Sequence, residues 1–124
     1  MSTYDDAYKT IIVDVDGVLV HWSPTEPDHI KGEVDGAKAM LMRLRRMGLT
    51  IHLYTARPVE EKESLSRALR ERGFVFDFLT CGKPCGFAYI DDRAVRFNGW
   101  ESAMKWVNTL QRGKFTHETG GTQC

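Results

Sequence analysis

Short apolar runs alternate along this chain with longer segments in which apolar residues recur at helical spacing. The first run begins at Ile11 and is rich in β-branched residues, and further runs cover 49–54, 74–79 and 87–90. Runs of this length and composition are typical of buried strands in a parallel sheet. The pattern therefore predicts four strands.

Three helices are predicted between and after these strands. The first follows Asp35, an expected N-cap, and stops at Gly48. The second begins at Pro58 and closes at Gly73, and the third covers 100–110. Such alternation of strands and helices predicts an α/β fold with a parallel sheet that helices cover on both faces.

The remaining segments show no hydrophobic periodicity. The stretch 21–29 contains two prolines and is expected to be a loop. We expect one domain over 1–113, because 124 residues can bury one core but not two. The polar residues 114–124 predict a disordered tail.

Charge and cysteine content narrow the class of protein. Lys plus Arg and Asp plus Glu both number 17, which argues against general attraction to nucleic acid or an anionic membrane. No apolar run reaches the roughly 20 residues of a membrane helix, and the acidic start is unlike a signal peptide. Three cysteines without an export signal favour free thiols, so we expect a cytoplasmic protein without membrane contact.

Two carboxylates stand at the end of the first predicted strand. Asp14 and Asp16 project to the same side if the strand continues through them, and ligands of an open α/β sheet bind beyond the carboxyl ends of its strands. Carboxylates this close repel unless a cation or a shared proton intervenes. Gly17 would let the backbone approach a ligand. The alternative interpretation is an ordinary Asp-Gly turn.

Three later stretches favour the first interpretation. The strand Leu53-Tyr54-Thr55-Ala56-Arg57 ends in a hydroxyl, Cys81-Gly82-Lys83-Pro84 places a lysine in a turn, and Ala88-Tyr89-Ile90-Asp91-Asp92-Arg93 ends in paired acids. Together with Asp-x-Asp-Gly, this order resembles the four motifs of the haloacid dehalogenase-like (HAD) phosphohydrolase superfamily, from about Ile11 to Trp100. The resemblance implies a Rossmann-like three-layer fold with the first strand central, of the small type without a cap domain.

The resemblance also implies a mechanism. Asp14 matches the nucleophile that takes the phosphoryl group as an aspartyl-phosphate. Asp16 matches the general acid and base. Thr55, Lys83 and Gly17 match the positions that contact or approach the phosphoryl group, where a hydroxyl and an ammonium would stabilise its charge.

Mg²⁺ is the cofactor that the resemblance implies, since it is a hard cation that takes oxygen ligands. Its expected ligands are the Asp14 carboxylate, the backbone carbonyl of Asp16 and the Asp91 carboxylate. Asp92 could take the place of Asp91 or orient Lys83, and the sequence does not separate these neighbours.

Arg57 follows the threonine motif and has two interpretations. A guanidinium binds phosphate bidentately, so Arg57, like Arg93, could contact the substrate. An Arg–Asp ion pair beside the site is the other interpretation. Trp22 and the histidines at 21 and 29 lie where the family carries a flap, and Trp22 could stack on a ligand or pack on the domain.

The identity of the phosphorylated substrate stays open between a nucleotide or nucleic-acid end, a phosphoprotein and a small phosphate ester. A site without a cap is open, and a second subunit of a homo-oligomer could cover it. Two rival functions are a HAD fold that only binds and a phospho-receiver signalling domain. The order of motifs argues against the receiver, whose phosphate-accepting Asp ends a middle strand, whereas the middle strand here ends in Thr55.

Overall fold

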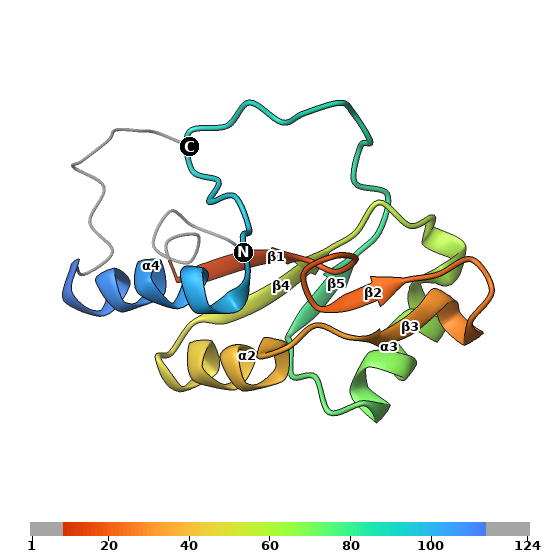
Figure 1. Cartoon of the computed structure of the whole chain (residues 1–124), viewed down its shortest axis with the longest axis horizontal. Coiled ribbons are helices and arrows are strands. Elements are labelled where there is room, and N and C mark those ends of the chain that lie inside the picture. The colour runs from red at the N-terminus through yellow and green to blue at the C-terminus, as the bar shows by residue number, and fades with distance from the viewer. Residues whose placement is uncertain (1–8, 114–124) are drawn as a thin grey trace.

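The structure is a computed structural model that describes residues 9–113, as a central parallel sheet, a small hairpin and three α-helices (Figure 1). The central sheet has the strand order β1-β4-β5, and the hairpin pairs β2 with β3. The strands are β1 (Thr10–Asp14), β2 (Val20–Trp22), β3 (Ile30–Glu33), β4 (Thr50–Tyr54) and β5 (Phe78–Thr80). The predicted tail at 114–124 lies outside the described residues.

The three α-helices follow the predicted order, and two short 3₁₀ turns accompany them. They are α2 (Ala37–Arg46), α3 (Lys62–Glu71) and α4 (Trp100–Gly113), with η1 (Pro27–His29) and η2 (Val59–Glu61). An α/β architecture with a central parallel sheet is thus confirmed, and it is compatible with a Rossmann-like fold. Among residues 9–113 no helix is both long and apolar enough to cross a membrane.

The helix ends show which local signals are decisive. Gly48 and Gly73 follow the last turns of α2 and α3, where their amides donate to the carbonyls three residues earlier, so both predicted stops are confirmed. The predicted N-cap is wrong, because Gly36 rather than Asp35 precedes α2 and no side chain caps that end. The first turn after Pro58 is the 3₁₀ turn η2 and not yet α-helix.

The register of the sheet separates a buried face from an exposed one. Val13, Leu53 and Leu79 are opposite one another on the three strands, and all three are buried. The next row, Ile12, His52 and Phe78, points the other way, with Ile12 63% and Phe78 58% exposed. Successive residues of a strand face opposite sides, so within the described chain only one face of the sheet has helical cover.

The prediction of helices on both faces is therefore wrong, and the packing of α4 explains why. Trp100 and Val107 of α4 are buried in the same core as the residues of α2 and α3. Arg43 of α2 also donates from Nη2 to the Asn108 side chain of α4 over 2.6 Å. The last helix thus packs beside α2 instead of crossing to the other side of the sheet.

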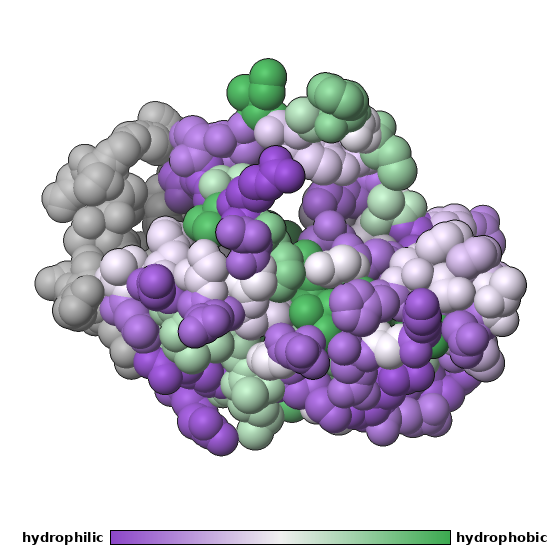
Figure 2. All heavy atoms as spheres, viewed as in Figure 1, coloured by the Kyte–Doolittle hydropathy of each residue, from purple (hydrophilic) through white to green (hydrophobic). Residues whose placement is uncertain are grey.

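The predicted fourth strand at 87–90 is also wrong. The segment arches away from the sheet in Figure 1, and Phe87 and Ile90 are fully exposed on it. Figure 2 shows apolar surface at this outer edge of the molecule. Local contacts hold the segment, because the Tyr89 hydroxyl donates to the Pro84 carbonyl and the Lys83 ammonium lies 4.6 Å from the Tyr89 ring centre. β1 is consequently an edge strand of the sheet and not the central one.

The stretch 21–29, expected to be a loop, mostly is one, but it connects the two strands of a hairpin that the sequence did not predict. Gly17 turns the chain with a φ of 88°, a conformation that costs a residue with a Cβ, and its amide donates to the Val20 carbonyl over 2.8 Å. β2 and β3 then pair antiparallel around η1, with an irregularity between His21 and Trp22. Alternation over three or four residues is too short to be detected in the sequence.

The difference between the two sheet faces gives a stability prediction. Ile51 is fully buried and Ile12 is largely exposed, although both are isoleucines of neighbouring strands. Ile51→Ala should lower the free energy of unfolding by about 2–5 kcal/mol because it leaves a cavity. Ile12→Ala, the matched control, should cost no more than about 1 kcal/mol. Urea unfolding measures both values, and equal losses would contradict the one-sided core.

Candidate active site

Three of the predicted motifs meet at the carboxyl ends of the parallel strands. Asp14 is the last residue of β1, Thr55 directly follows β4, and Lys83 comes three residues after β5. The Thr55 amide donates to the Thr80 carbonyl over 3.0 Å, and the Lys83 amide donates to the Thr55 carbonyl over 2.9 Å. These backbone bonds fix the lysine turn beside the ends of β1 and β4.

The Asp14 carboxylate has one oxygen fixed and one facing a cation. Its Oδ1 accepts a hydrogen bond from the Val15 amide at 2.8 Å, and its Oδ2 lies 3.7 Å from the Lys83 ammonium. The Asp14 side chain keeps 40% of its surface exposed, whereas Lys83 keeps 20%. The arrangement is that of an accessible carboxylate oxygen beside a half-buried positive charge.

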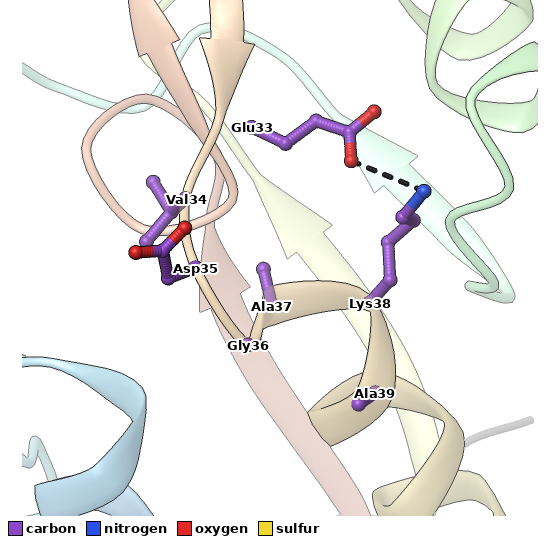
Figure 3. A pocket seen from close by; sticks show the side chains of 7 residues that line it. All are labelled: Glu33, Val34, Asp35, Gly36, Ala37, Lys38 and Ala39. Carbon is purple, nitrogen blue, oxygen red and sulfur yellow. Dashed lines mark ion pairs between the residues drawn. The ribbon is translucent and has the colours of Figure 1, made fainter.

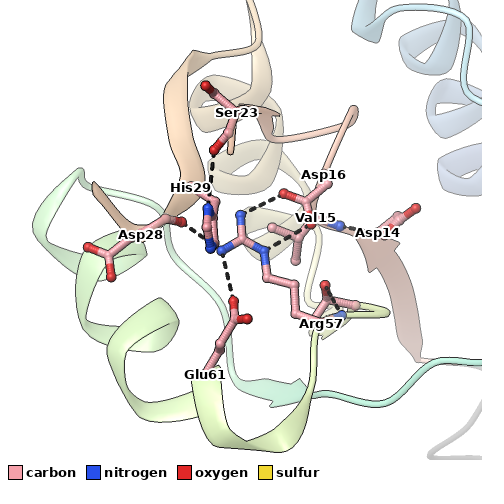
Figure 4. A network of polar contacts seen from close by, with 9 residues as sticks. Asp14, Val15, Asp16, Ser23, Asp28, His29, Arg57 and Glu61 are labelled. Atoms are coloured by element: carbon pink, nitrogen blue, oxygen red, sulfur yellow. Dashed lines mark hydrogen bonds and ion pairs between the residues drawn. The ribbon is translucent and has the colours of Figure 1, made fainter. Parts of the chain in front are cut away.

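Asp16 does not join Asp14, and the expected convergence of the two carboxylates is wrong. β1 ends at Asp14, and Asp16 forms only an isolated bridge with Val20 before the turn at Gly17. Figure 4 shows the two carboxylates turned away from each other. The i and i+2 rule holds within a strand, and here the strand ends before the second acid.

Both oxygens of Asp16 accept hydrogen bonds from Arg57. Nε donates to Oδ2 over 3.0 Å and Nη2 donates to Oδ1 over 2.7 Å. Arg57 also donates from Nη1 to the Asp28 carbonyl over 2.7 Å, and the same nitrogen lies 3.5 Å from Glu61. The ion pair that the sequence left open for Arg57 is therefore present, and each of its three side-chain nitrogens has an acceptor within the protein (Figure 4).

Burial and neighbouring charges shift the pKa of Arg57 in opposite directions. Only 7% of the residue is exposed, and burial alone would lower the pKa of the guanidinium. The hydrogen bonds and charge of Asp16, helped by Glu61, outweigh burial and raise that pKa above its usual value. A raised pKa for a base means that its charge is lost only at still higher pH, so Arg57 keeps its positive charge through the whole neutral range.

Thr55 is completely buried, and its hydroxyl oxygen accepts a hydrogen bond from the Arg57 amide at 3.2 Å. This contact is a local turn in which the hydroxyl satisfies a backbone donor two residues on. The hydroxyl of Thr55 is thus not exposed, and its contact with a phosphoryl group stays a prediction. Gly17 likewise serves the turn, and nothing lies within 4 Å of the position a Cβ would take there.

The predicted magnesium ligands are not gathered in one place. Asp91 lies in the exposed segment after Lys83, and its carboxylate accepts a hydrogen bond from the Arg93 amide at 2.8 Å. Within residues 9–113 no group of three or more His, Cys, Asp or Glu side chains could hold a metal ion. The side chains of Asp14, Asp16 and Asp91 therefore form no ready-made cation site among these residues, and Asp92 is as exposed as Asp91.

The hairpin provides further residues of the site. Trp22 is half exposed and stacks on His29, with ring centres 5.5 Å apart, and the His29 Nδ1 lies 3.2 Å from the Ser23 carbonyl. Asp28 and His29 both have positive φ, 55° and 57°, which is unusual for residues with a side chain. The contacts of Asp28 and Glu61 with Arg57 were not predicted from the sequence. Only the four-residue spacing of Arg57 and Glu61 could have indicated one of them.

Two neighbouring features take no part in this cluster. Burial raises the pKa of the Cys81 thiol, which leaves it protonated and a weak nucleophile at neutral pH. A hollow of about 370 Å³ opens at the start of α2 (Figure 3). The Glu33–Lys38 ion pair, 3.1 Å long, lies beside it. The hollow is lined by residues 33–39 and contains no residue predicted for the site.

Comparison with known proteins gives a structural neighbour. A crystal structure of a target protein from Vibrio cholerae is similar to this chain with a TM-score of 0.62 and 27% sequence identity. The similarity covers 86% of this chain and 98% of that one, and the neighbour's description names no activity. No known family profile matches the chain. The curated proteins likewise give no match.

The buried hydroxyl of Thr55 gives a second stability prediction. Thr55→Val keeps the shape but leaves the Arg57 amide without its acceptor, so unfolding should become easier by about 1–3 kcal/mol. Thr55→Ser keeps the acceptor and serves as a comparison. Thr80→Val removes an exposed hydroxyl that contacts His52 and should cost about 0.5 kcal/mol or less. Chemical denaturation measures the free energy of unfolding of each variant. An unchanged value for Thr55→Val would show that the hydroxyl does not contribute to stability.

Proposed function

We propose that this protein is a HAD-like phosphomonoester hydrolase that acts through an aspartyl-phosphate on Asp14. The observation that carries the proposal is the 3.7 Å approach of the Lys83 ammonium to the Asp14 carboxylate at the carboxyl edge of a parallel sheet. Ligands of open α/β sheets bind at this edge. The order of the Asp-x-Asp-Gly, Thr, Lys and Asp-Asp motifs supports the same reaction.

The proposed reaction uses the accessible oxygen of Asp14 as nucleophile. It attacks phosphorus, the ester oxygen departs with a proton, and water then hydrolyses the acyl phosphate to regenerate the carboxylate. Lys83 would stabilise the negative charge on the phosphoryl oxygens. Stabilisation of this charge is the main way in which enzymes lower the barrier to phosphoryl transfer. Asp16 in its protonated form is the proposed source of that proton, and it recovers one from the attacking water in the second step. Arg57 holds its carboxyl group in one orientation.

Mg²⁺ is the proposed cofactor on the strength of the motifs alone. The ligands that the motifs imply are Asp14, Asp16 and Asp91, and they are not gathered among the described residues. No step of the reaction is therefore assigned to the ion. Its general contribution in phosphoryl transfer is to neutralise charge on the phosphate oxygens.

The proposed substrate class is a phosphate monoester of open identity: a nucleotide or nucleic-acid end, a phosphoprotein or a small ester. No separate cap is formed between 9 and 113, and the short β2–β3 hairpin is the element beside the site. Free thiols at Cys81 and Cys85 favour a reducing compartment, and a cytoplasmic location is proposed on that ground.

A second candidate function is binding without catalysis. The observation that favours it is that both oxygens of Asp16 accept hydrogen bonds from Arg57, while the Asp91 carboxylate accepts one from the Arg93 amide. A receiver domain is less well supported, because Asp14 ends an edge strand and the middle strand β4 leads to Thr55. Turnover of a phosphate ester separates binding from catalysis.

Asp14→Asn should abolish hydrolysis of para-nitrophenyl phosphate, because an amide is a poor nucleophile. The loss should be on the order of several powers of ten in kcat, each equal to about 1.36 kcal/mol. Asp35→Asn, an exposed position outside the cluster, is the matched control and should keep the wild-type rate. A folded Asp14→Asn protein that turns over at the wild-type rate would exclude Asp14 as nucleophile.

Removal of divalent metal should abolish the same activity, and added Mg²⁺ should restore it. The reason is that the charge on the phosphoryl oxygens would lose most of its neutralisation, with Lys83 as the remaining cation beside Asp14. The measurement is para-nitrophenyl phosphate hydrolysis in excess EDTA and after titration with Mg²⁺. Undiminished hydrolysis in EDTA would contradict the cofactor and leave the nucleophile untouched.

A further inference from the structure

We propose that Arg57 is a positioning residue that couples the β2–β3 hairpin to the orientation of Asp16, so that the hairpin and the carboxylate move as one unit. The catalytic part of this inference rests on the proposed phosphatase function. The mechanical part rests on the contacts of Arg57 alone and can be tested without activity.

The first observation is the geometry of the Arg57–Asp16 pair. Two nitrogens of one planar guanidinium donate to the two oxygens of one carboxylate, at 3.0 Å and 2.7 Å. Such a bidentate pair fixes direction as well as distance. A lysine carries the same charge but presents it as a point, so it cannot hold both oxygens in one plane.

The second observation is that the same guanidinium reaches the hairpin. Nη1 donates to the Asp28 carbonyl over 2.7 Å. Asp28 and His29 lie in the left-handed region, at φ 55° and 57°. This conformation costs free energy, so it persists only where the surrounding contacts hold it in place. The His29 amide donates to the Glu26 carbonyl over 2.8 Å and closes the turn from its other side.

The third observation is burial. Arg57 is 7% exposed, with Glu61 lying 3.5 Å from the nitrogen that contacts Asp28. A buried charge with a missing partner is unstable, so displacement of the hairpin would leave Nη1 unsatisfied and destabilise the whole cluster. Only a concerted movement avoids that loss. The hairpin and Asp16 are therefore linked through one side chain, although they approach it from different directions (Figure 4).

The consequence for the reaction concerns the leaving group. Asp16 supplies a proton to the departing oxygen, so its orientation matters for alkyl esters, which leave as poor alkoxides. It matters less for aryl esters, whose phenolate leaves without a proton. Loss of Arg57 should thus affect the two classes of substrate unequally, which a general loss of structure would not do.

The kinetic experiment compares Arg57→Lys with wild type on an alkyl phosphate and on para-nitrophenyl phosphate. The kcat for the alkyl ester should fall by about 100-fold more than that for the aryl ester, which is the lower range of what general acid catalysis contributes. Arg45→Gln is the matched control, because it breaks an Arg–Asp pair with Asp77 before β5, and should affect both substrates equally. Equal losses in Arg57→Lys, or a rise in KM alone, would overturn the positioning role.

The mechanical part is measured by hydrogen exchange of the backbone amides. Peptides covering 26–30 should exchange at least tenfold faster in Arg57→Lys than in wild type, with the strands of the central sheet unchanged. Asp28→Asn is the matched control, since it keeps the carbonyl and a residue tolerant of positive φ, and it should exchange like wild type. Unchanged exchange at 26–30 in Arg57→Lys would overturn the coupling.

Two further outcomes are decided by the same measurements. If the wild-type protein hydrolyses no phosphate ester, the proposed function fails, while exchange at 26–30 still decides the coupling. If Arg57→Lys does not fold, the double variant Arg57→Gln/Asp16→Asn removes both charges together and gives the exchange result. Faster exchange at 26–30 in that variant supports the coupling, and exchange equal to wild type overturns it.

Discussion

A buried guanidinium imposes conditions on everything that surrounds it. Its charge must be matched and its N–H groups need acceptors, because neither can be satisfied by water at 7% exposure. Arg57 meets these conditions with acceptors from three segments: Asp16 after β1, the Asp28 carbonyl of η1 and Glu61 of η2. The loop after β1, the strained turn of the hairpin and the first turn after Pro58 thus have a common reason for their places.

The sheet supplies the frame on which this cluster is built. Its buried row of Val13, Leu53 and Leu79 anchors three strands to the helices, and the strands deliver Asp14, Thr55 and Lys83 to one edge. The opposite row has little cover and contributes little to the core. Rigidity at the carboxyl edge therefore derives from one layer of packing together with the backbone bonds that tie the lysine turn to Thr55.

Sequence reasoning succeeded where a signal was local or repeated. The stops at Gly48 and Gly73 and the β1 and β4 strands follow from short-range patterns, whereas β5 begins four residues later than predicted. The place of Lys83 beside Asp14 agrees with what the motif resemblance implied. Sequence reasoning failed where a segment has to choose between competing contacts. An apolar run of four residues cannot reveal that Tyr89 will contact Pro84 instead of a neighbouring strand, and two acids in sequence cannot reveal that Arg57 will turn one of them aside.

The loop between β1 and β2 has a consequence for how the chain matures during synthesis. Asp16 in this loop is fixed by Arg57 from 41 residues away, and the Val18 carbonyl accepts a hydrogen bond from the Trp100 indole, 82 residues away. A chain leaving the ribosome exposes this loop first but completes its contacts only after Trp100 has emerged. Domains made in this way fold as units after their last contacting segment appears. An early translated part of the site is therefore among the last to acquire its final shape.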